Sequence, residues 1–348
     1  MDGETEIKFI GCLFGGAIGD ALGMPLTGRT RVEIAAIGPV SEFMAAELTA
    51  PVSLPLTALA DPELDDPLGP GQWTDDTQLS LALADALIEE QGMFVPDTWA
   101  HALVRWLNNA PRGPGLSSLE AAVQLRTGGA EWDEAADPEG GGCGAATRAA
   151  PIGLAFASDP ALRRRCAVLQ ALTTHGHPDA QAAALAVAEA TALVLAIGPE
   201  SFSQWDGAAF LQTLIDAVRG FAPEFEEFAR CLEGARSLLL EEVDAETAVR
   251  VLGVSAWSRE AVPTALYLVA RYPHDLEQLL LSAVNLTGGA VESIATIAGA
   301  VGGALHGVTA LPGRWRRQVE DAPRLLETAL RLYRPGGGAT RCGAGRQE

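Results

Sequence analysis

The chain of 348 residues is poor in lysine, in cysteine and in long hydrophobic runs. Lys8 is its only lysine, which excludes Schiff-base chemistry and a Walker-type phosphate loop, since each needs an internal lysine. The five cysteines show no CxxC spacing, which argues against a disulfide framework and a zinc site. No apolar stretch reaches the ~18 uninterrupted residues of a membrane span, so we expect a soluble protein without a membrane partner.

Positive charge is also scarce. Lysine and arginine total 24 against 45 acidic residues, which gives a formal net charge of −21. Binding to a nucleic-acid backbone depends mainly on basic side chains that release counterions, so nucleic acid is excluded as an expected partner. The first eight residues are acidic and polar rather than basic and then apolar. This start lacks a secretory signal, and we expect a cytoplasmic location.

Strand signals are few, and the apolar residues instead recur at helical spacing. Runs of β-branched residues are short, and glycine and proline gather in connectors. The periodicity predicts an all-α fold, with helices at 79–88, 98–108, 180–197, 210–221, 246–252, 264–271, 294–306 and 322–332. No long linker or fixed-period repeat divides the chain. We therefore expect one domain over residues 1–334 and a disordered, glycine-rich tail at 335–348.

The most distinctive segment is 72–77, with the sequence Gln-Trp-Thr-Asp-Asp-Thr at the start of an apolar helical run. Oxygen ligands gathered at a helix start suit a hard cation. A second interpretation stays open, because Thr74 or Asp75 is also a typical N-cap and carboxylates are stabilised in a first helical turn. A further oxygen-bearing segment, 288–293, precedes the helix at 294–306. Two such helix starts, brought face to face, could hold a divalent metal.

Five short segments, taken in order, resemble the ADP-ribosylglycohydrolases of the dinitrogenase-reductase-activating type. The resemblance runs from about residue 11 to residue 332. The matched segments are Gly-Asp-Ala-Leu-Gly at 19–23, Trp-Thr-Asp-Asp-Thr at 73–77, the glycine-rich loop at 142–151, Thr-His at 174–175 and the Gly-Gly segment at 288–293. We expect each to be a loop before a small-residue helix, and each alone is weak evidence, because a glycine-rich turn is usually only a turn. Five ordered matches are far more specific.

The resemblance implies an all-α fold with two Mg²⁺ ions in a central cleft, and hydrolysis of the bond at ribose C1″ of an ADP-ribosylated protein or small molecule. An oxocarbenium-like transition state needs the ribose held, the leaving group assisted and a water or carboxylate at the anomeric carbon. A metal ion can orient the ribose hydroxyls and lower the pKa of a bound water. Backbone N–H groups of a glycine-rich loop can take the diphosphate without any lysine.

Residue roles follow from the same resemblance. The implied metal ligands are Thr74, Asp75, Asp76, Glu292 and Ser293. Among them Asp75, Asp76 and Glu292 are the catalytic carboxylates, and Asp76 is the residue expected to polarise the attacking water. The implied ligand-binding residues are Asp20, Gly142, Cys143, Gly144, Ala145, Arg148 and His175. Of these, Asp20 is expected to orient ligands without touching the metal, and Cys143 to be a packing residue rather than a nucleophile.

The chain also departs from the family pattern. Ala290 stands where the first carboxylate of the second metal segment is expected, and Glu292 is one methylene longer than the usual Asp. Thr27 stands where many members carry a glutamate, for which Glu33 is a candidate substitute. One strong Mg²⁺ position is therefore expected, with the second weakened. Two hypotheses stay open: a hydrolase with an altered metal site, or a relative that binds an ADP-ribose-like ligand or a protein partner without turning it over.

Overall fold

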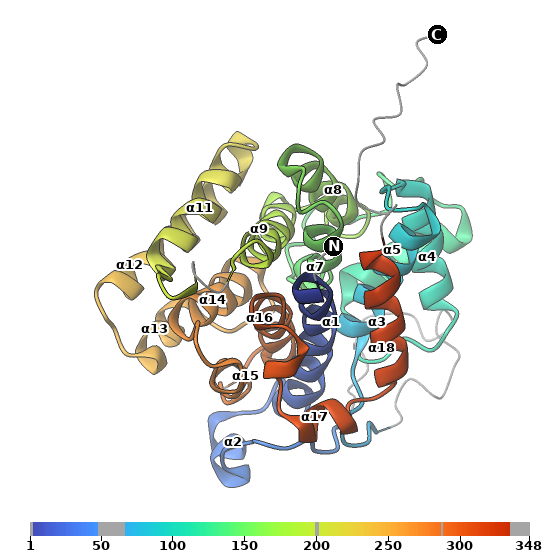
Figure 1. The fold of residues 1–348 in the computed structure, drawn as a ribbon. Helices are drawn as coiled ribbons and strands as arrows, with labels where there is room; N and C mark the ends of the chain where they lie inside the picture. The colour runs from blue at the N-terminus through green and yellow to red at the C-terminus, as the bar shows by residue number, and fades with distance from the viewer. Residues whose placement is uncertain (1–2, 48–66, 199–201, 287, 335–348) are drawn as a thin grey trace.

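The structure is a computed structural model that describes residues 3–47, 67–198, 202–286 and 288–334 (Figure 1). Helices dominate these ranges, and β structure within them is limited to isolated bridges such as Gly142 with Trp257. The all-α prediction is therefore confirmed. The tail predicted to be disordered at 335–348 lies outside the described residues.

The helices follow one another with short connections. Their bounds are α1 Gly3–Gly23, η1 Met24–Leu26, α2 Arg31–Ile37, α3 Asp75–Glu89, α4 Pro96–Leu107, α5 Leu116–Thr127, α6 Gly144–Thr147, α7 Ala150–Ala155, α8 Pro160–Leu172, α9 Pro178–Leu195, α11 Gly207–Arg219, η4 Pro223–Phe225, α12 Glu226–Leu240, α13 Ala245–Leu252, α14 Ser258–Arg271, α15 Leu276–Val284, α16 Val291–His306, η5 Val308–Ala310, α17 Gly313–Gln318 and α18 Ala322–Tyr333.

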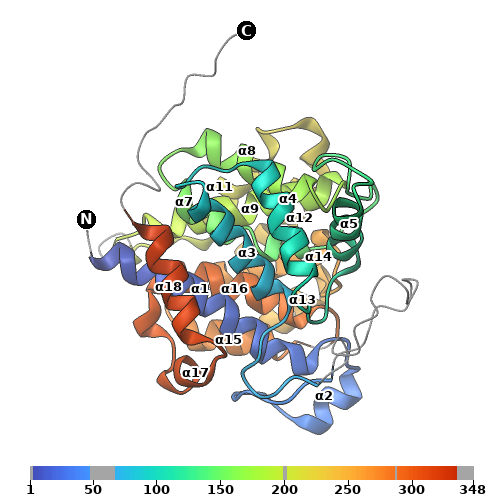
Figure 2. The same cartoon turned by 90° about the vertical axis from the view of Figure 1, so that its right-hand side faces the viewer.

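Helices α1 and α16 lie side by side at the centre of the molecule, although they come from opposite ends of the chain (Figures 1 and 2). Glycines at four-residue spacing on α1 permit this approach, because i and i+4 positions share one helix face. A Cβ at Gly15 would overlap the carbonyl of Gly299, and one at Gly19 would overlap that of Ala295. The contact brings the C-terminal end of α1 to the N-terminal end of α16.

The other helices surround this central pair. On one side α16 packs against α9, α14 and α15, and on the other α1 packs against α18 and α3 (Figure 1). The buried apolar side chains form one large core that extends from α1 to α18. Gly3–Leu26 is long and apolar enough to cross a membrane by length and composition alone, but 94% of its apolar window is buried inside the fold. Its apolar character is thus accounted for by its place in the core.

Two local predictions were wrong. Residues 19–23 were expected to form a loop, yet they are the last turns of α1, where glycine is required by the close approach to α16 rather than by a turn. The helix expected at 264–271 begins six residues earlier, at Ser258, and includes Pro263. Burial of almost the whole of α14 in the core outweighs the cost of this internal proline.

Candidate active site

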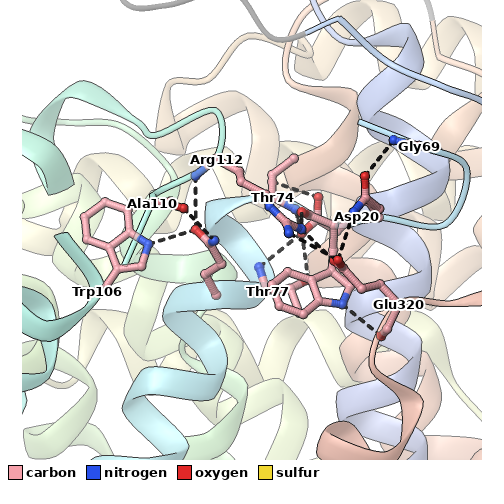
Figure 3. A network of polar contacts seen from close by, with 11 residues as sticks. Asp20, Gly69, Thr74, Thr77, Trp106, Ala110, Arg112 and Glu320 are labelled. Carbon is pink, nitrogen blue, oxygen red and sulfur yellow. Dashed lines mark hydrogen bonds and ion pairs between the residues drawn. The ribbon is translucent and has the colours of Figure 1, made fainter. Parts of the chain in front are cut away.

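The N-terminus of α3 carries the paired carboxylates Asp75 and Asp76 in its first turn. Thr74 occupies the N-cap position, but its own side chain makes no capping hydrogen bond. The cap comes from α1, because Asp20 accepts hydrogen bonds from the backbone N–H groups of Thr74 and Thr77 at 3.0 and 3.1 Å (Figure 3). The hydroxyls of the same two threonines also donate to Asp20, at 2.8 and 2.6 Å. A fully buried carboxylate thus fixes the helix start.

A second polar network holds the outer side of this helix start (Figure 3). Arg112 forms a bidentate ion pair with Glu320, with nitrogen to oxygen distances of 2.6 and 3.1 Å. The Arg112 carbonyl accepts a hydrogen bond from Asp75 N at 2.8 Å, and the indole of Trp73 donates to the Glu320 carbonyl at 3.0 Å. Sequence patterns do not reveal this network, because Arg112 and Glu320 are 208 residues apart.

The start of α16 meets the start of α3. Ser293 Oγ donates to Asp76 Oδ2 at 2.9 Å and lies 3.4 Å from Glu292 Oε1. The neighbouring Asp75 has a different partner, because its Oδ2 accepts a hydrogen bond from Gly115 N at 3.0 Å. The structure therefore brings Asp76, Glu292 and Ser293 together, as the two oxygen-rich segments predicted. Their assigned roles as metal ligands and catalytic groups stay predictions.

Negative charge accumulates between these helix starts. Burial, together with the charges of Asp20 and Glu292, raises the pKa of the Asp75 carboxyl to about 8. Burial also raises the pKa of Asp76, with the adjacent Asp75 as the next cause, and raises that of Glu292 to about 7. Bringing several carboxylates into a low-dielectric site is unfavourable unless a positive charge balances them. The site thus has the electrostatic character of a cation site.

The oxygen donors at this site suit a hard cation that binds only a few protein ligands. Among the described residues, no three His, Cys, Asp or Glu side chains gather as a metal-binding group. Asp76 and Glu292 instead approach through the Ser293 hydroxyl. Mg²⁺ commonly binds through one or two carboxylates and keeps several waters, so these oxygens suit it in type and number. Thr74, whose hydroxyl donates to Asp20, keeps lone pairs that could serve the same ion.

The glycine-rich loop before α6 borders this cluster. The side chain of Cys143 interacts with that of Ser293, and the backbone N–H of Cys143 donates to the carbonyl of Ala256 at 2.8 Å. Ser258 Oγ lies 2.7 and 2.8 Å from the carbonyls of Gly141 and Gly142, which fixes the loop on the start of α14. Ser258 was not predicted from the sequence. Burial raises the pKa of the Cys143 thiol above its usual range, which favours the unreactive thiol form.

His175 lies beneath the same loop. A Cβ at Gly144 would come 3.4 Å from His175 Nε2, so the buried imidazole packs closely against the glycine backbone of the loop. His175 Nδ1 lies 2.7 Å from the hydroxyl of Thr174. Burial, together with the nearby Arg148, lowers the pKa of His175 to about 3, and the ring is neutral at physiological pH. Ala145 is buried in α6, directly after this glycine.

Arg148 is fully buried and supports the glycine-rich loop from the interior of the protein. Its Nε donates to Gln170 Oε1 at 2.8 Å, and one terminal nitrogen donates to Ser118 and to the Gly144 carbonyl. The other donates to the Gln170 carbonyl and to Thr174 Oγ1. All five N–H donors of the guanidinium are thus engaged within the protein. This geometry favours a positioning role for Arg148, and the direct ligand contact expected from the sequence stays a prediction.

The departures from the family pattern lie together at this site. Ala290 is the N-cap residue of α16 and provides no capping side chain. The Thr27 hydroxyl donates to Glu292 Oε2, so Thr27 faces the carboxylate cluster. Glu33, the candidate substitute for a glutamate at position 27, instead closes a capping box with Thr30 at the exposed start of α2. That engagement removes Glu33 from the cluster in this structure.

Comparisons with known proteins bear on the chain as a whole. The model of the family described as ADP-ribosylglycohydrolase matches residues 1–341. A protein of Archaeoglobus fulgidus is 34% identical over 343 residues, which cover 94% of this chain and 96% of that protein. The protein named ADP-ribosylarginine hydrolase Tri1, from Pseudomonas putida (strain GB-1), is 26% identical over 274 residues, which cover 76% of this chain and 67% of that protein. A solved structure described as an ADP-ribosylglycohydrolase-related protein complex has a TM-score of 0.70 and 25% identity, and the match covers 95% of this chain and 99% of its own.

Proposed function

Because the chain belongs to the ADP-ribosylglycohydrolase family, we propose that it is a Mg²⁺-dependent hydrolase of the glycosidic bond at ribose C1″ of an ADP-ribosylated protein or small molecule. The observation that carries this proposal is the meeting of Asp76 with Glu292 through the Ser293 hydroxyl. Two helix starts from distant parts of the chain place hard oxygen donors at one point, beside a loop without side chains at Gly142 and Gly144.

The carboxylates have distinct roles in this proposal. In its ionised form Asp76 accepts the proton of the attacking water as a carboxylate general base, and the departing group takes up a proton as the bond at C1″ breaks. Asp75 and Glu292 supply negative charge where the ribose develops positive charge in an oxocarbenium-like transition state. Asp20 takes no part in bond changes, since all four of its hydrogen bonds fix the start of α3. A bound Mg²⁺ would supply a Lewis acid that orients the ribose hydroxyls and lowers the pKa of a water.

We expect the ADP-ribose to bind along the glycine-rich loop and next to His175. Cys143 connects the loop to the carboxylate cluster through Ser293, so a ribose at the cluster has its diphosphate directed along residues 142–145. The neutral His175 adds no charge beside a diphosphate and presents one ring edge to this loop. Ser258 and Arg148 keep the loop backbone fixed, which lowers the entropic cost of binding.

Release of ADP-ribose tests the proposal. The purified chain is incubated with Mg²⁺ and either an ADP-ribosylated arginine peptide or an ADP-ribosylated serine peptide, and free ADP-ribose is measured. We expect release from at least one substrate, loss of at least about 100-fold on Asp76→Asn, and loss on chelation with EDTA. Arginine is the first substrate to try, because one relative is named an ADP-ribosylarginine hydrolase.

A binding-only protein is the second candidate, and the departures at Thr27 and Ala290 favour it. It would bind ADP-ribose in calorimetry and release none from either peptide. Activity that is unchanged in Asp76→Asn or in EDTA would contradict the metal-dependent hydrolase.

A further inference from the structure

Thr27 lies in the turn that follows α1 and η1, opposite the start of α16. Two backbone features hold the two segments together at this point. Gly28 N donates to the carbonyl of Gly289 at 3.0 Å, and a Cβ at Gly23 would come 2.7 Å from the Cα of Glu292. The backbone of Glu292 is thus fixed against the end of α1. Its flexible side chain still needs separate constraints if the carboxylate is to keep one orientation.

The Thr27 hydroxyl contacts Glu292 in two ways. It accepts a hydrogen bond from Glu292 N at 3.3 Å, and it donates one to Glu292 Oε2. One hydroxyl has a single donor and two lone pairs, so both bonds can form together. The other carboxylate oxygen, Oε1, faces Ser293. Glu292 is therefore held at its backbone and at one end of its carboxylate by the same side chain.

The start of α16 also lacks a cap of its own. Its N-cap residue is Ala290, which has no side-chain acceptor for the free N–H groups of the first turn. Thr27 supplies that acceptor from another part of the chain, 265 residues away. Asp20 does the same for α3. The end of α1 and its following turn thus cap both helix starts that form the site.

We propose, on the premise of the proposed function, that Thr27 is a positioning residue for Glu292 and thereby sets the affinity of the site for a divalent cation. Its hydroxyl takes the place of the capping oxygen that Ala290 cannot provide. It also directs the Glu292 carboxylate toward Asp76 and Ser293. Partners that orient a metal-binding carboxylate usually affect metal affinity by about 10- to 100-fold. Thr27 and Ala290 both depart from the family pattern, and the hydroxyl of Thr27 compensates for the missing side-chain oxygen at Ala290.

Calorimetric titration of Mg²⁺ into the full-length chain tests the inference without any substrate. Thr27→Val keeps the shape of the side chain and removes the hydroxyl, and we expect Mg²⁺ affinity to fall about 10- to 100-fold. Thr27→Ser keeps the hydroxyl and should restore most of the affinity. Thr30→Val is the matched control. It removes a capping hydroxyl three residues away that contacts Glu33 rather than Glu292, so Mg²⁺ affinity should equal that of the wild type.

A double-mutant cycle separates positioning from general stability. If Thr27 acts through Glu292, adding Thr27→Val to Glu292→Gln should cause little further loss of Mg²⁺ affinity. Additive losses, unchanged affinity in Thr27→Val, or a wild-type chain that binds no Mg²⁺ would each overturn the inference. A wild-type chain that binds Mg²⁺ with the expected Thr27 dependence, but releases no ADP-ribose from either peptide, would overturn only the proposed hydrolase activity.

Discussion

Single residues at the site are tuned by burial, and His175 shows this in a measurable way. Its pKa is lowered to about 3 in the folded protein, against about 6.5 for an unperturbed histidine. The unfolded chain therefore takes up the proton first as the pH falls. The contribution of His175 to the free energy of unfolding is therefore fully present above about pH 6.5. It decreases as the pH falls toward 3, by up to about 1.4 kcal/mol for each pH unit.

We predict that His175→Gln makes the free energy of unfolding less dependent on pH between 6.5 and 4. Glutamine cannot take up a proton in the unfolded state, so the contribution of this position to the slope disappears. Urea unfolding at several pH values measures the slope. His101→Gln is the control, since His101 is exposed on α4 and outside the site, and it should leave the slope as in the wild type. Equal slopes in wild type and His175→Gln would show that the ring is not held neutral.

Sequence motifs located the carboxylates but not what fixes them. Asp75, Asp76 and Glu292 were named because oxygen-bearing residues at helix starts can be read from local order. The capping of α3 by Asp20 joins residues 54 positions apart, and that of α16 by Thr27 joins residues 265 apart. No local pattern encodes such contacts. For the same reason the sequence does not reveal the partners of Arg148, which are Ser118, Gln170 and Thr174.

At the scale of elements, the contact of α1 with α16 sets the geometry of the site. Gly19 lies in this contact one residue before Asp20, and an added Cβ would overlap the Ala295 carbonyl. We predict that Gly19→Ala lowers the free energy of unfolding by about 3 kcal/mol or more, because backbone rather than a flexible side chain must move. Urea unfolding of the cation-free protein measures the loss.

Gly234→Ala provides the matched control within another helix. Gly234 lies inside α12, and a Cβ there would have no heavy atom within 4 Å. The substitution should therefore stabilise the protein by about 0.5–1 kcal/mol, as expected for alanine in a helix interior. If both variants lost the same stability, the close approach of α1 and α16 could not be the reason for glycine at position 19.

The same contact explains which elements were predictable. Helices with a clear apolar face, such as α11 and α18, were found from periodicity. The helix α1 was missed because it is buried nearly all round and its glycines resemble those of a loop. Glycine serves there for close packing between helices, and only the partner helix distinguishes that use from a turn. The partner, α16, is almost 300 residues away along the chain.

At the scale of the whole molecule, the fold places its two central helices so that their adjoining ends gather negative charge. Figure 2 shows α3 beside the pair formed by α1 and α16, and its first turn adds Asp75 and Asp76 to Glu292. The buried Arg148 interacts favourably with both aspartates and offsets part of their charge. Such an arrangement trades stability for function, since repelling carboxylates are kept in a buried site. A bound divalent cation would balance these charges, so that the same carboxylates would stabilise the folded protein instead of destabilising it.

We therefore predict that Mg²⁺ stabilises the folded protein and that Asp76 is required for the effect. At a Mg²⁺ concentration 100 times the Kd, binding adds about 2.7 kcal/mol to the free energy of unfolding, which raises the melting temperature. Asp76→Asn should abolish this rise. In EDTA its melting temperature should equal or exceed that of the wild type, because asparagine replaces a carboxyl whose pKa is raised by burial and by Asp75, and such a group destabilises the folded state near neutral pH. Thermal unfolding with and without Mg²⁺ measures both effects.

Asp85→Asn is the control for this experiment, because it makes the same substitution on the same helix away from the cluster. Asp85 pairs with Arg324 at 2.9 Å near the surface, and loss of such a pair costs at most about 1 kcal/mol. This variant should keep the full Mg²⁺-dependent rise. A rise that persists in Asp76→Asn would locate the cation elsewhere in the molecule. A wild-type protein without any rise would mean that the carboxylates remain uncompensated, and the gathering of charge at the helix starts would then need a different ligand as its reason.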